Sequence, residues 1–435
     1  MYLVKQFPPT HQLWVAPPSG RHSWFIVGTL LTACLALFFA GTALAQTSFT
    51  FLYDFTGVNG SGSAPIGDLS MDSQGTLYGV TAPQNGRAAR IYELTPPTSL
   101  AGFWTKTNLY IAYNGFPVGG KLSPVILGKS GELYGTSTSC TTAPFQFGSC
   151  AFQLVPPTAA AGAWTVNILH LFQGATQGDG SHVGYGKLAM DANGNLYGVT
   201  QSGGVSDLHH TGIVYQLTPP TTPDATWTEH ILYKFQTNSF HYPQMNATLG
   251  PDGSLYGSTR DGTQNGGVIY RLAPPAVPDG AWTMSVINRT VGGEFSGGTT
   301  QLTVASSGTI YGVSTEAGGA FALTPPVVPG GAWTISRLPS NTQGGPGREL
   351  ALDENGNLYG TDYMGQTVYK LSPPATPGGT WTYMLLAQFN QYQPFGRPLV
   401  DSSGKVFAAT LAGGLGANCT VRQQPVGCGT VFELQ

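Results

Sequence analysis

Charged residues are scarce in this sequence, and neither sign dominates. Lys and Arg number 18 and Asp and Glu number 21 among 435 residues, which gives a formal net charge of -3. A protein that binds the phosphates of a nucleic acid needs a basic surface. The composition therefore excludes a strongly basic nucleic-acid-binding domain, and we expect no nucleic-acid partner.

The sequence motifs of common enzymes are also missing. The sequence has no Gly-x-Ser-x-Gly nucleophile turn, no Walker-type phosphate loop, no His-Glu-x-x-His and no Asp-dense calcium loop. We therefore expect no cofactor, and no motif names a reaction.

Long helix-forming runs are absent after the N-terminal segment. Short segments rich in aromatic and β-branched residues alternate instead with turns, and the sequence holds 61 Gly and 32 Pro. This pattern predicts an all-β chain with many tight turns.

The first 45 residues have the pattern of a signal peptide. Lys5 and Arg21 precede an apolar run over 24–40, and Ala43-Leu-Ala45 offers the small residues of a cleavage site. We expect cleavage after this site and a secreted, periplasmic or cell-surface protein. The apolar run is long enough to span a bilayer, so a retained anchor is the alternative. A lipoprotein signal at Cys34 is a third option, which the apolar residues that follow Cys34 argue against.

Four cysteines follow the predicted cleavage site, in two close pairs: Cys140 with Cys150 and Cys419 with Cys428. An even number of cysteines in an exported chain predicts two local disulfides. Zinc is the alternative partner, but the two pairs lie far apart and lack the short ligand spacing that zinc sites use.

A ten-residue phrase recurs along the chain. Its clearest copy is Asp191-Ala-Asn-Gly-Asn-Leu-Tyr-Gly-Val-Thr200, with close copies at 72–81 and 353–362. Looser copies centre on Tyr134, Tyr256, Tyr311 and Phe407. Seven copies with a period of roughly 50 residues indicate one repeat architecture rather than several unrelated domains.

Each repeat predicts four short strands, which in the third repeat cover 187–190, 196–200, 213–217 and 227–235. From the second Pro after the third strand to the next Trp there are seven positions in all six cases, so this turn is fixed. The step between the aromatic residues of the second and third strands varies from 10 to 25 positions. Loops that vary in this way are where binding usually occurs.

The two ends of the repeat array complement each other. Residues 47–55 read as a fourth strand, and 430–434 read as a third strand without a fourth. Together they make one complete repeat, which predicts a seven-bladed β-propeller over 46–435 with its last blade closed by the N-terminal strand. An open solenoid is the alternative, but it would need atypical capping repeats.

The recurring Asp-x-x-Gly-x-Leu-Tyr-Gly-x-Thr phrase, followed by Val-Tyr-x-Leu-x-Pro-Pro and a Trp, resembles the GloVer tandem-repeat proteins of bacterial secretomes. It is more distantly similar to NHL-type and SMP-30/streptogramin-lyase-like propellers. The resemblance implies an exported propeller without a settled activity. In SMP-30-like enzymes acidic and amide residues of the inner strands meet a metal at the channel mouth. Here the inner strands read Gly67-Asp-Leu69 and Gly186-Lys-Leu188, and we identify Asp68 as the single carboxylate so placed, which argues against an enzyme.

Residues that repeat in most blades are expected to be structural. The turn Asp at 72, 191, 353 and 401 suits an Asx turn better than a cation site. The Tyr, Trp and Pro-Pro positions should pack blade against blade. A small polar residue after each Tyr-Gly pair should bond the nearby backbone rather than a ligand. These residues are Thr81, Ser137, Thr200, Thr259, Ser314, Asp362 and Thr410.

Function is expected in residues that do not repeat, on loops of one face. The candidate ligand-binding residues are Asp179, His182, Asp207, His209, His210, His241, Tyr242, Arg260, Asp261, Asp362, Tyr363 and Tyr392, with Phe240, Glu316 and Phe395 beside them. The His and Asp residues could bind a metal or transfer protons. The aromatic residues suit a glycan or peptide surface. Ordinary loop packing is the alternative for both sets.

The sequence therefore favours an exported, monomeric binding module over an enzyme, with a polysaccharide, peptide or partner protein as ligand and no membrane contact after cleavage. The alternative is a metal-dependent lyase or lactonase that uses the His and Asp loops of the third repeat beside Asp362. A third possibility is a structural component of the cell envelope. Fold alone does not decide among them.

Overall fold

The structure is a computed structural model that describes residues 48–435 except for 59, 84–87, 100–101, 114–116, 143–145, 160–161, 184–185, 206–210, 223–224, 237–242, 245, 261–266, 278–279, 290–300, 315–318, 329, 340–348, 363, 377, 415–418, 422–423 and 426. The predicted signal peptide lies outside these residues. Within the described ranges, no helix has the length and apolarity needed to span a bilayer.

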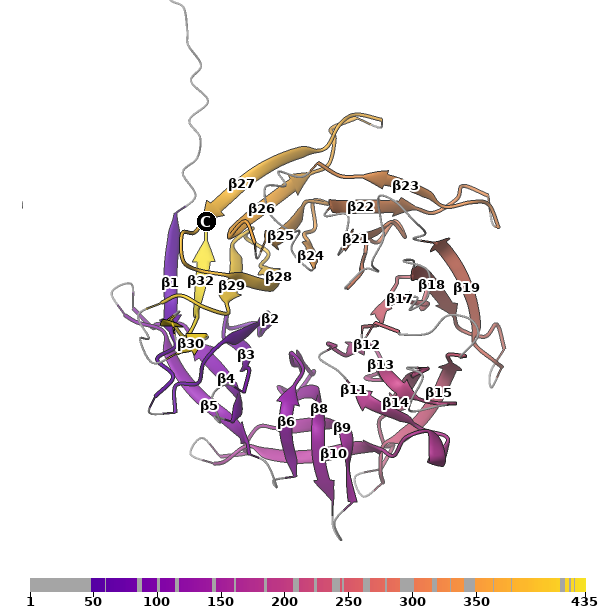
Figure 1. The fold of residues 1–435 in the computed structure, drawn as a ribbon, viewed down its shortest axis with the longest axis horizontal. Helices are drawn as coiled ribbons and strands as arrows, with labels where there is room; N and C mark the ends of the chain where they lie inside the picture. Colours follow the sequence, from indigo (N-terminus) through magenta and orange to yellow (C-terminus); the bar gives the residue numbers. More distant parts are fainter. Residues whose placement is uncertain are drawn as a thin grey trace, which may run out of the picture. The chain divides into compact units, whose positions relative to one another are not determined.

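Seven antiparallel sheets are arranged in a closed ring, as the sequence predicts (Figure 1). Blade 1 comprises β2 Pro65–Met71, β3 Leu77–Thr81, β4 Ala89–Thr95 and β5 Thr105–Ala112. Blade 2 comprises β6 Val118–Leu122, β7 Ile126–Leu127, β8 Leu133–Thr142, β9 Gln146–Val155 and β10 Thr165–Phe172. Blade 3 comprises β11 Gly180–Val183, β12 Ala189–Met190, β13 Leu196–Gly203, β14 Ile213–Thr218 and β15 Thr228–Lys234, preceded by the 3-10 turn Ala175–Gln177.

The remaining blades follow the same order from the centre of the ring outward. Blade 4 comprises β16 Thr248–Leu249, β17 Leu255–Arg260, β18 Gly267–Ala273 and β19 Thr283–Arg289. Blade 5 comprises β20 Thr303–Val304, β21 Ile310–Ser314, β22 Gly319–Thr324 and β23 Thr334–Arg337. Blade 6 comprises β24 Leu350–Leu352, β25 Leu358–Asp362, β26 Thr367–Ser372 and β27 Thr382–Gln388.

Blade 7 is built from both ends of the described chain. It comprises β28 Pro394–Val400, β29 Val406–Thr410, β32 Thr430–Leu434 and, as its outer strand, β1 Phe49–Asp54. A small hairpin, β30 Thr420–Val421 with β31 Gln424–Pro425, is inserted between β29 and β32. Strand β1 pairs with β32 from Phe49 opposite Leu434 to Asp54 opposite Thr430. This pairing confirms the predicted closure, which protects the edge of β32.

The hydrophobic core is divided among the interfaces between blades. Seven buried clusters are found among the described residues, and each is shared by two neighbouring blades. Trp residues contribute as predicted, because Trp227 of blade 3 packs on Tyr134 of blade 2 with ring centroids 5.8 Å apart. Trp282 and Trp381 pack in the same way on Tyr197 and Tyr311 of the preceding blades. The repeated aromatic residues therefore hold the ring together.

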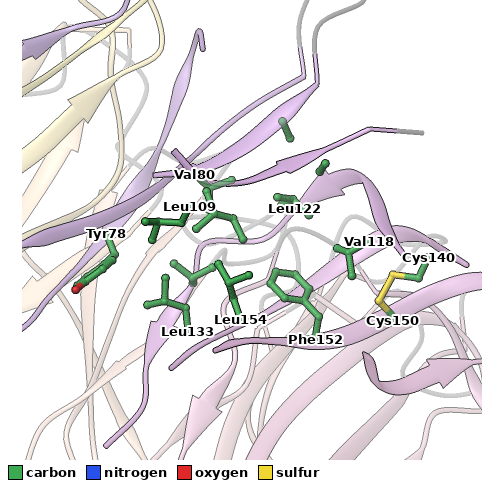
Figure 2. Close-up of a cluster of buried hydrophobic side chains, with 14 residues drawn as sticks. Tyr78, Val80, Leu109, Val118, Leu122, Leu133, Cys140, Cys150, Phe152 and Leu154 are labelled. Carbon is green, nitrogen blue, oxygen red and sulfur yellow. A yellow bond between two sulfur atoms is a disulfide. The ribbon is translucent and has the colours of Figure 1, made fainter. Parts of the chain in front are cut away.

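Both predicted disulfides are present. Cys140 pairs with Cys150 and Cys419 pairs with Cys428, with Cα atoms 5.9 Å and 5.1 Å apart. Figure 2 shows the first disulfide beside Val118 and Phe152, in the cluster shared by blades 1 and 2. Each disulfide closes a short loop, a constraint on the unfolded chain that stabilises the fold by ~2–3 kcal/mol.

Hydrogen bonds explain why the recurring sequence motif begins with Asp. The Asp72 carboxylate accepts hydrogen bonds from the backbone N–H groups of Gln74 and Thr76, both at 2.9 Å, and from the Tyr78 hydroxyl at 3.1 Å. Asp191 and Asp353 repeat these contacts, and Asp401 repeats the backbone contacts. The Asx-turn interpretation is therefore confirmed.

The Gly of each Tyr-Gly pair is required by the ring that lies on it. A Cβ at Gly198 would lie within 3.0 Å of the Tyr215 hydroxyl and ring, closer than real Cβ contacts. The same holds for Gly79 with Tyr92, Gly257 with Tyr270 and Gly360 with Tyr369, and for Gly135 and Gly312 with the Phe rings of their blades. Each third-strand aromatic ring is thus packed directly on the bare backbone of the second strand.

The inner strands depart from the prediction. In blade 3 the expected strand 187–190 is paired only at β12, and a separate strand, β11, pairs with the far end of β13. In blade 1 the ladder between β2 and β3 shifts register between Ile66 and Ser70, and in blade 7 it shifts between Phe395 and Leu399. A bulge interrupts these ladders, and bulges redirect side chains.

We predict that Gly257→Ala lowers the free energy of unfolding by about 2–3 kcal/mol, because the added methyl group would overlap the Tyr270 ring. Adding Tyr270→Phe should recover part of this loss, since blade 7 pairs Ala408 with Phe432 at the same place and the Tyr270 hydroxyl has no hydrogen-bond partner. Urea unfolding of the two single variants and the double variant measures this coupling.

The matched control is Gly319→Ala, because a Cβ at Gly319 meets no atom of the described residues within 4 Å. It should change stability by less than about 0.5 kcal/mol. Equal losses for the two Gly variants would contradict the proposed role of the ring contact.

Candidate functional site

A cavity of about 340 Å³ lies where the inner edges of the seven blades meet. Its wall includes one equivalent residue from each of six blades, four positions before the turn residue of the repeat. These residues are Asp68, Pro124, Lys187, Asn246, Gln301 and Glu349. The equivalent residue of blade 7 is Arg397, whose Nε lies 4.0 Å from Asp68 Oδ2. The position recurs in every blade, but the residue at it does not.

These channel residues sit where the inner-strand ladder is broken. Asp68 lies inside the register shift of β2 and has a φ of 67°, a conformation that non-Gly residues rarely adopt. Arg397 lies inside the matching shift of β28, and its backbone N–H donates a 2.6 Å hydrogen bond to Asp68 Oδ1. A Cβ at Gly67 would overlap the backbone at Phe395 and Gly396, so the two bulges pack directly together. The closure of the ring therefore positions the site.

Two carboxyl groups and two cations face one another in the channel. Burial raises the pKa of Glu349 well above its usual value, and the adjacent Asp68 carboxylate, which is hydrogen-bonded to Glu349, raises it further. Burial also lowers the pKa of Lys187 to about 8, although the Asp68 carboxylate partly offsets this effect. Glu349 therefore retains its proton to a higher pH than an exposed Glu, and Lys187 can lose its proton near neutrality.

This arrangement corrects one expectation. Asp68 is not the single carboxylate at the channel position, because Glu349 occupies the equivalent position in blade 6. Both residues come directly before the Leu of the inner strand. Blades 1 and 3 have Gly before the channel residue, whereas blade 6 has Arg348 there. A search for the Gly-x-Leu pattern therefore does not find Glu349. Aligning the repeats on the turn residue and counting back four positions finds all seven channel residues.

Two oxygen atoms of the cavity wall have no hydrogen-bond partner in the described part of the chain. Glu349 Oε2 and Asn246 Oδ1 have almost no accessible surface and accept no hydrogen bond from the described residues. Both side chains line the cavity. Buried polar atoms are nearly always paired, and an unpaired one costs about 1–3 kcal/mol. A ligand with O–H or N–H donors could pair with these atoms once the Glu349 and Asn246 side chains turn toward the cavity.

The channel does not suit the metal that the resemblance implies. Carboxylate and amide oxygens are present, but Lys187 and Arg397 act on the same carboxyl groups. A metal ion would add further positive charge beside these two cations, which repel it. Asp68 Oδ1 is also occupied by the backbone N–H of Arg397. We therefore consider the channel as a site for an organic ligand.

The small polar residues after each Tyr-Gly pair mostly serve the backbone, as predicted. Thr81, Thr200 and Thr410 each accept a hydrogen bond from the facing strand, at 3.0–3.1 Å. Asp362 accepts hydrogen bonds from the N–H groups of Met364 at 3.0 Å and Gly365 at 2.8 Å. Its carboxylate therefore holds its own loop, and Asp362 is not part of the cavity wall.

The loop residues of the third repeat separate in the structure. Asp179 turns outward to the rim between blades 2 and 3, where its Oδ2 lies 3.1 Å from His170 Nε2. Glu229 Oε2 lies 3.5 Å from the same nitrogen. His182 is exposed, bonds Ser181 and lines a separate hollow of about 450 Å³. Sequence reasoning found Asp179 but missed His170 and Glu229, which lie on outer strands.

His170, Asp179 and Glu229, here called the rim cluster, affect one another's pKa. Burial opposes the charge on His170, but its hydrogen bond with Asp179 and the nearby Glu229 carboxylate outweigh burial and raise its pKa. Burial also opposes the charge on Asp179, but hydrogen bonds from His170 and the Gln173 backbone lower its pKa overall. Burial and the Asp179 carboxylate raise the pKa of Glu229 to about 7, against the opposing effect of His170.

The other candidates are placed as follows. Tyr392 packs on Phe51 with ring centroids 5.0 Å apart and on Phe389 at 5.8 Å. Phe395 lines the channel cavity. Arg260 ends β17, and only its backbone is described. Asp207, His209, His210, Phe240, His241, Tyr242, Asp261, Glu316 and Tyr363 lie outside the described residues.

Comparison with known proteins identifies the fold and no family. No protein-family model and no curated protein matches the sequence. Among solved structures, virginiamycin B lyase from Staphylococcus aureus is similar, with 14% identity, a TM-score of 0.54, and 89% of this chain and 99% of the lyase covered. A protein from Lactobacillus plantarum is similar at 16% identity and a TM-score of 0.51, over 73% of this chain and 83% of that one. At this identity the likeness shows a shared propeller fold, and the resemblance to GloVer repeats stays a prediction.

We predict a pH-dependent loss of stability that Glu349 causes. Its pKa is higher in the folded than in the unfolded protein, so the folded state binds more protons above about pH 4.5. Stability is then highest below that pH and falls as the pH rises toward the folded pKa. Glu349→Gln removes this titration, so the variant should be more stable than wild type at pH 7 and equal to it near pH 4.

Thermal unfolding of the full chain between pH 4 and pH 8 measures the difference. Glu354→Gln is the matched control, because Glu354 is exposed on a turn of the same blade. Parallel curves for wild type and Glu349→Gln would show that Glu349 carries no such penalty.

Proposed function

We propose that the protein binds a small hydroxyl-rich molecule, a sugar or the terminal unit of a glycan, in the cavity at the centre of the ring. The observation that carries the proposal is the pair of unpartnered oxygens on the cavity wall, Glu349 Oε2 and Asn246 Oδ1. Hydroxyl groups can donate to both. A volume of about 340 Å³ falls within the range of roughly 300–1,000 Å³ in which small organic ligands bind.

The rest of the wall supports this ligand class. Gln244, Asn246 and Gln301 provide amides from two neighbouring blades, and each amide can both donate and accept. Phe395, Ile66 and Leu411 provide an apolar surface for the C–H face of a ring. The charges largely cancel, since Asp68 and Arg397 face each other. A neutral polar ligand therefore fits better than a highly charged one.

A second candidate function, proton-transfer catalysis at the same site, is favoured by Lys187 and Glu349. The pKa of Lys187 is lowered to about 8, so its amine is able to accept a proton near neutral pH. Glu349 holds its proton, because its pKa is raised, and could donate it to a leaving oxygen. In an elimination, Lys187 would take the proton from carbon while Glu349 protonates the departing oxygen. This proposal replaces the metal-dependent lyase or lactonase with a chemistry that needs no metal.

We also propose that the protein is exported and that its repeats are of the GloVer type. Two disulfides are usual in oxidising compartments such as the periplasm or the cell exterior. The apolar run over 24–40 and the Ala-Leu-Ala sequence support the same location. The repeated Leu-Tyr-Gly phrase supports the repeat type.

We expect a screen of mono- and oligosaccharides by ligand-observed NMR to find binding that depends on the channel. Asn246→Ala and Gln301→Ala should each weaken it about tenfold, because each removes one hydrogen-bonding side chain from the wall. His182→Ala is the control, since His182 lies in a separate hollow. Equal binding by all three variants would place the ligand outside the channel, and no binding of any saccharide would reject the sugar class.

Catalysis is tested separately with any saccharide that binds. Lys187→Met should abolish turnover while binding is retained within about threefold, because only the proton acceptor is lost. Turnover that persists in this variant would reject Lys187 as the base.

A further inference from the structure

A second cluster of side chains lies on the outer rim, away from the residues of the channel. His170 comes from β10 of blade 2, Asp179 from the loop before β11, and Glu229 from β15 of blade 3. His170 Nε2 lies 3.1 Å from Asp179 Oδ2 and 3.5 Å from Glu229 Oε2. The three potential ligand atoms lie within 4.8 Å of one another.

These distances match the spacing of ligands around one metal ion. Zinc bonds of about 2.0–2.1 Å in tetrahedral geometry separate neighbouring ligand atoms by about 3.3 Å. The two distances from His170 Nε2 lie on either side of that value. Imidazole nitrogen with carboxylate oxygen is a donor set that zinc accepts. The ion would take the place of the proton that His170 and Asp179 now share.

The cluster is held in position before any ion binds. Asp179 accepts hydrogen bonds from the backbone N–H groups of Gln173 and Gly180, which fix its carboxylate. The His170 ring packs edge-on against Phe172 with centroids 4.7 Å apart. The positive charge of Lys234 also lowers the pKa of Glu229. The Lys234 Nζ, however, donates a 2.7 Å hydrogen bond to the carbonyl oxygen of Gly178. The nearby cation therefore has a backbone partner of its own.

Glu229 shows that the cluster is incomplete. Its Oε1 has almost no accessible surface and accepts no hydrogen bond from the described residues. The side chains of His170, Asp179 and Glu229 nevertheless keep exposures of 22%, 10% and 14%, so water can reach the group. A bound ion would neutralise two carboxylates that lie close together, and water would complete its coordination.

The cluster is specific to this blade interface. Six positions after the Trp of each outer strand, blade 2 has His170, whereas blades 1 and 3 have Tyr110 and Tyr233. Two positions after that Trp, blade 3 has Glu229, whereas blades 1, 2 and 4 have Lys106, Val166 and Met284. Tyr110 shows the ordinary role of the first position, since its hydroxyl donates to the Val118 carbonyl of the next blade at 2.8 Å. His170 and Glu229 thus both depart from the residues that other blades have at these positions, and both are of types that bind metals.

We propose that His170, Asp179 and Glu229 form a binding site for a zinc-like divalent transition metal that joins the outer strands of blades 2 and 3. The ion connects β10 to β15 across the blade interface. It thereby stabilises the folded state by mass action, as any ligand of the native protein does. The site is independent of the ligand proposed for the channel.

The test is thermal unfolding and calorimetric titration of the EDTA-treated full chain with zinc chloride. We expect one zinc per chain at this site and a midpoint that rises by at least about 2 °C. His170→Tyr should weaken zinc binding at least about tenfold and remove the rise. Tyr stands at this position in blades 1 and 3, so the variant should fold. Glu229→Gln, which keeps the shape and loses the charge, should act in the same direction.

His182→Ala is the matched control, because this exposed histidine lies only twelve positions further along the sequence and outside the cluster. It should retain the full rise. A midpoint that zinc leaves unchanged in wild type, or a rise that persists in His170→Tyr, would overturn the proposal. Saccharide binding by His170→Tyr should equal that of wild type, so failure of one site is distinguishable from failure of the other.

Discussion

The contact between one aromatic ring and one bare glycine, repeated around the ring of blades, is the constraint on which this structure rests. Tyr215 lies directly on Gly198, and the space leaves no room for a Cβ. Because the ring replaces the missing side chain, it is fully buried within the blade while its neighbours pack against the next blade. In blade 7 the pair differs, because Ala408 lies opposite Phe432.

A fold held by repeated contacts restricts where function can lie. The second and third strands of each blade are occupied by packing, and the turn Asp and the small hydroxyl residues are occupied by the backbone. Side chains in two places are not required for this packing or for these backbone hydrogen bonds. One is the inner strand, where bulges in blades 1 and 7 free Asp68 and Arg397 from the ladder. The other is the outer strand, where the side chains of His170 and Glu229 remain partly exposed.

The sequence predicted the blades, the closure and both disulfides, because each depends on spacing along the chain. Of the channel residues it identified only Asp68 and Phe395, because a bulge breaks the period of two on which strand interpretation relies. Asp68 and Glu349 are separated by most of the chain, and only closure of the ring brings them together. Only one of the three rim residues was found, for a similar reason. Asp179 stood out as a loop residue, whereas His170 and Glu229 were hidden inside strands predicted to be structural.

The two sites differ in charge, and this difference decides what each can bind. In the channel, Arg397 faces Asp68, and Lys187 acts on the same carboxyl groups, so the site has no surplus of negative charge to attract a cation. What its described residues lack is hydrogen-bond donors for two buried oxygens. At the rim, two carboxylates share one imidazole, and the nearest lysine is bonded to a carbonyl oxygen. The rim therefore lacks positive charge, which a hydroxyl-rich ligand cannot supply and a metal ion can.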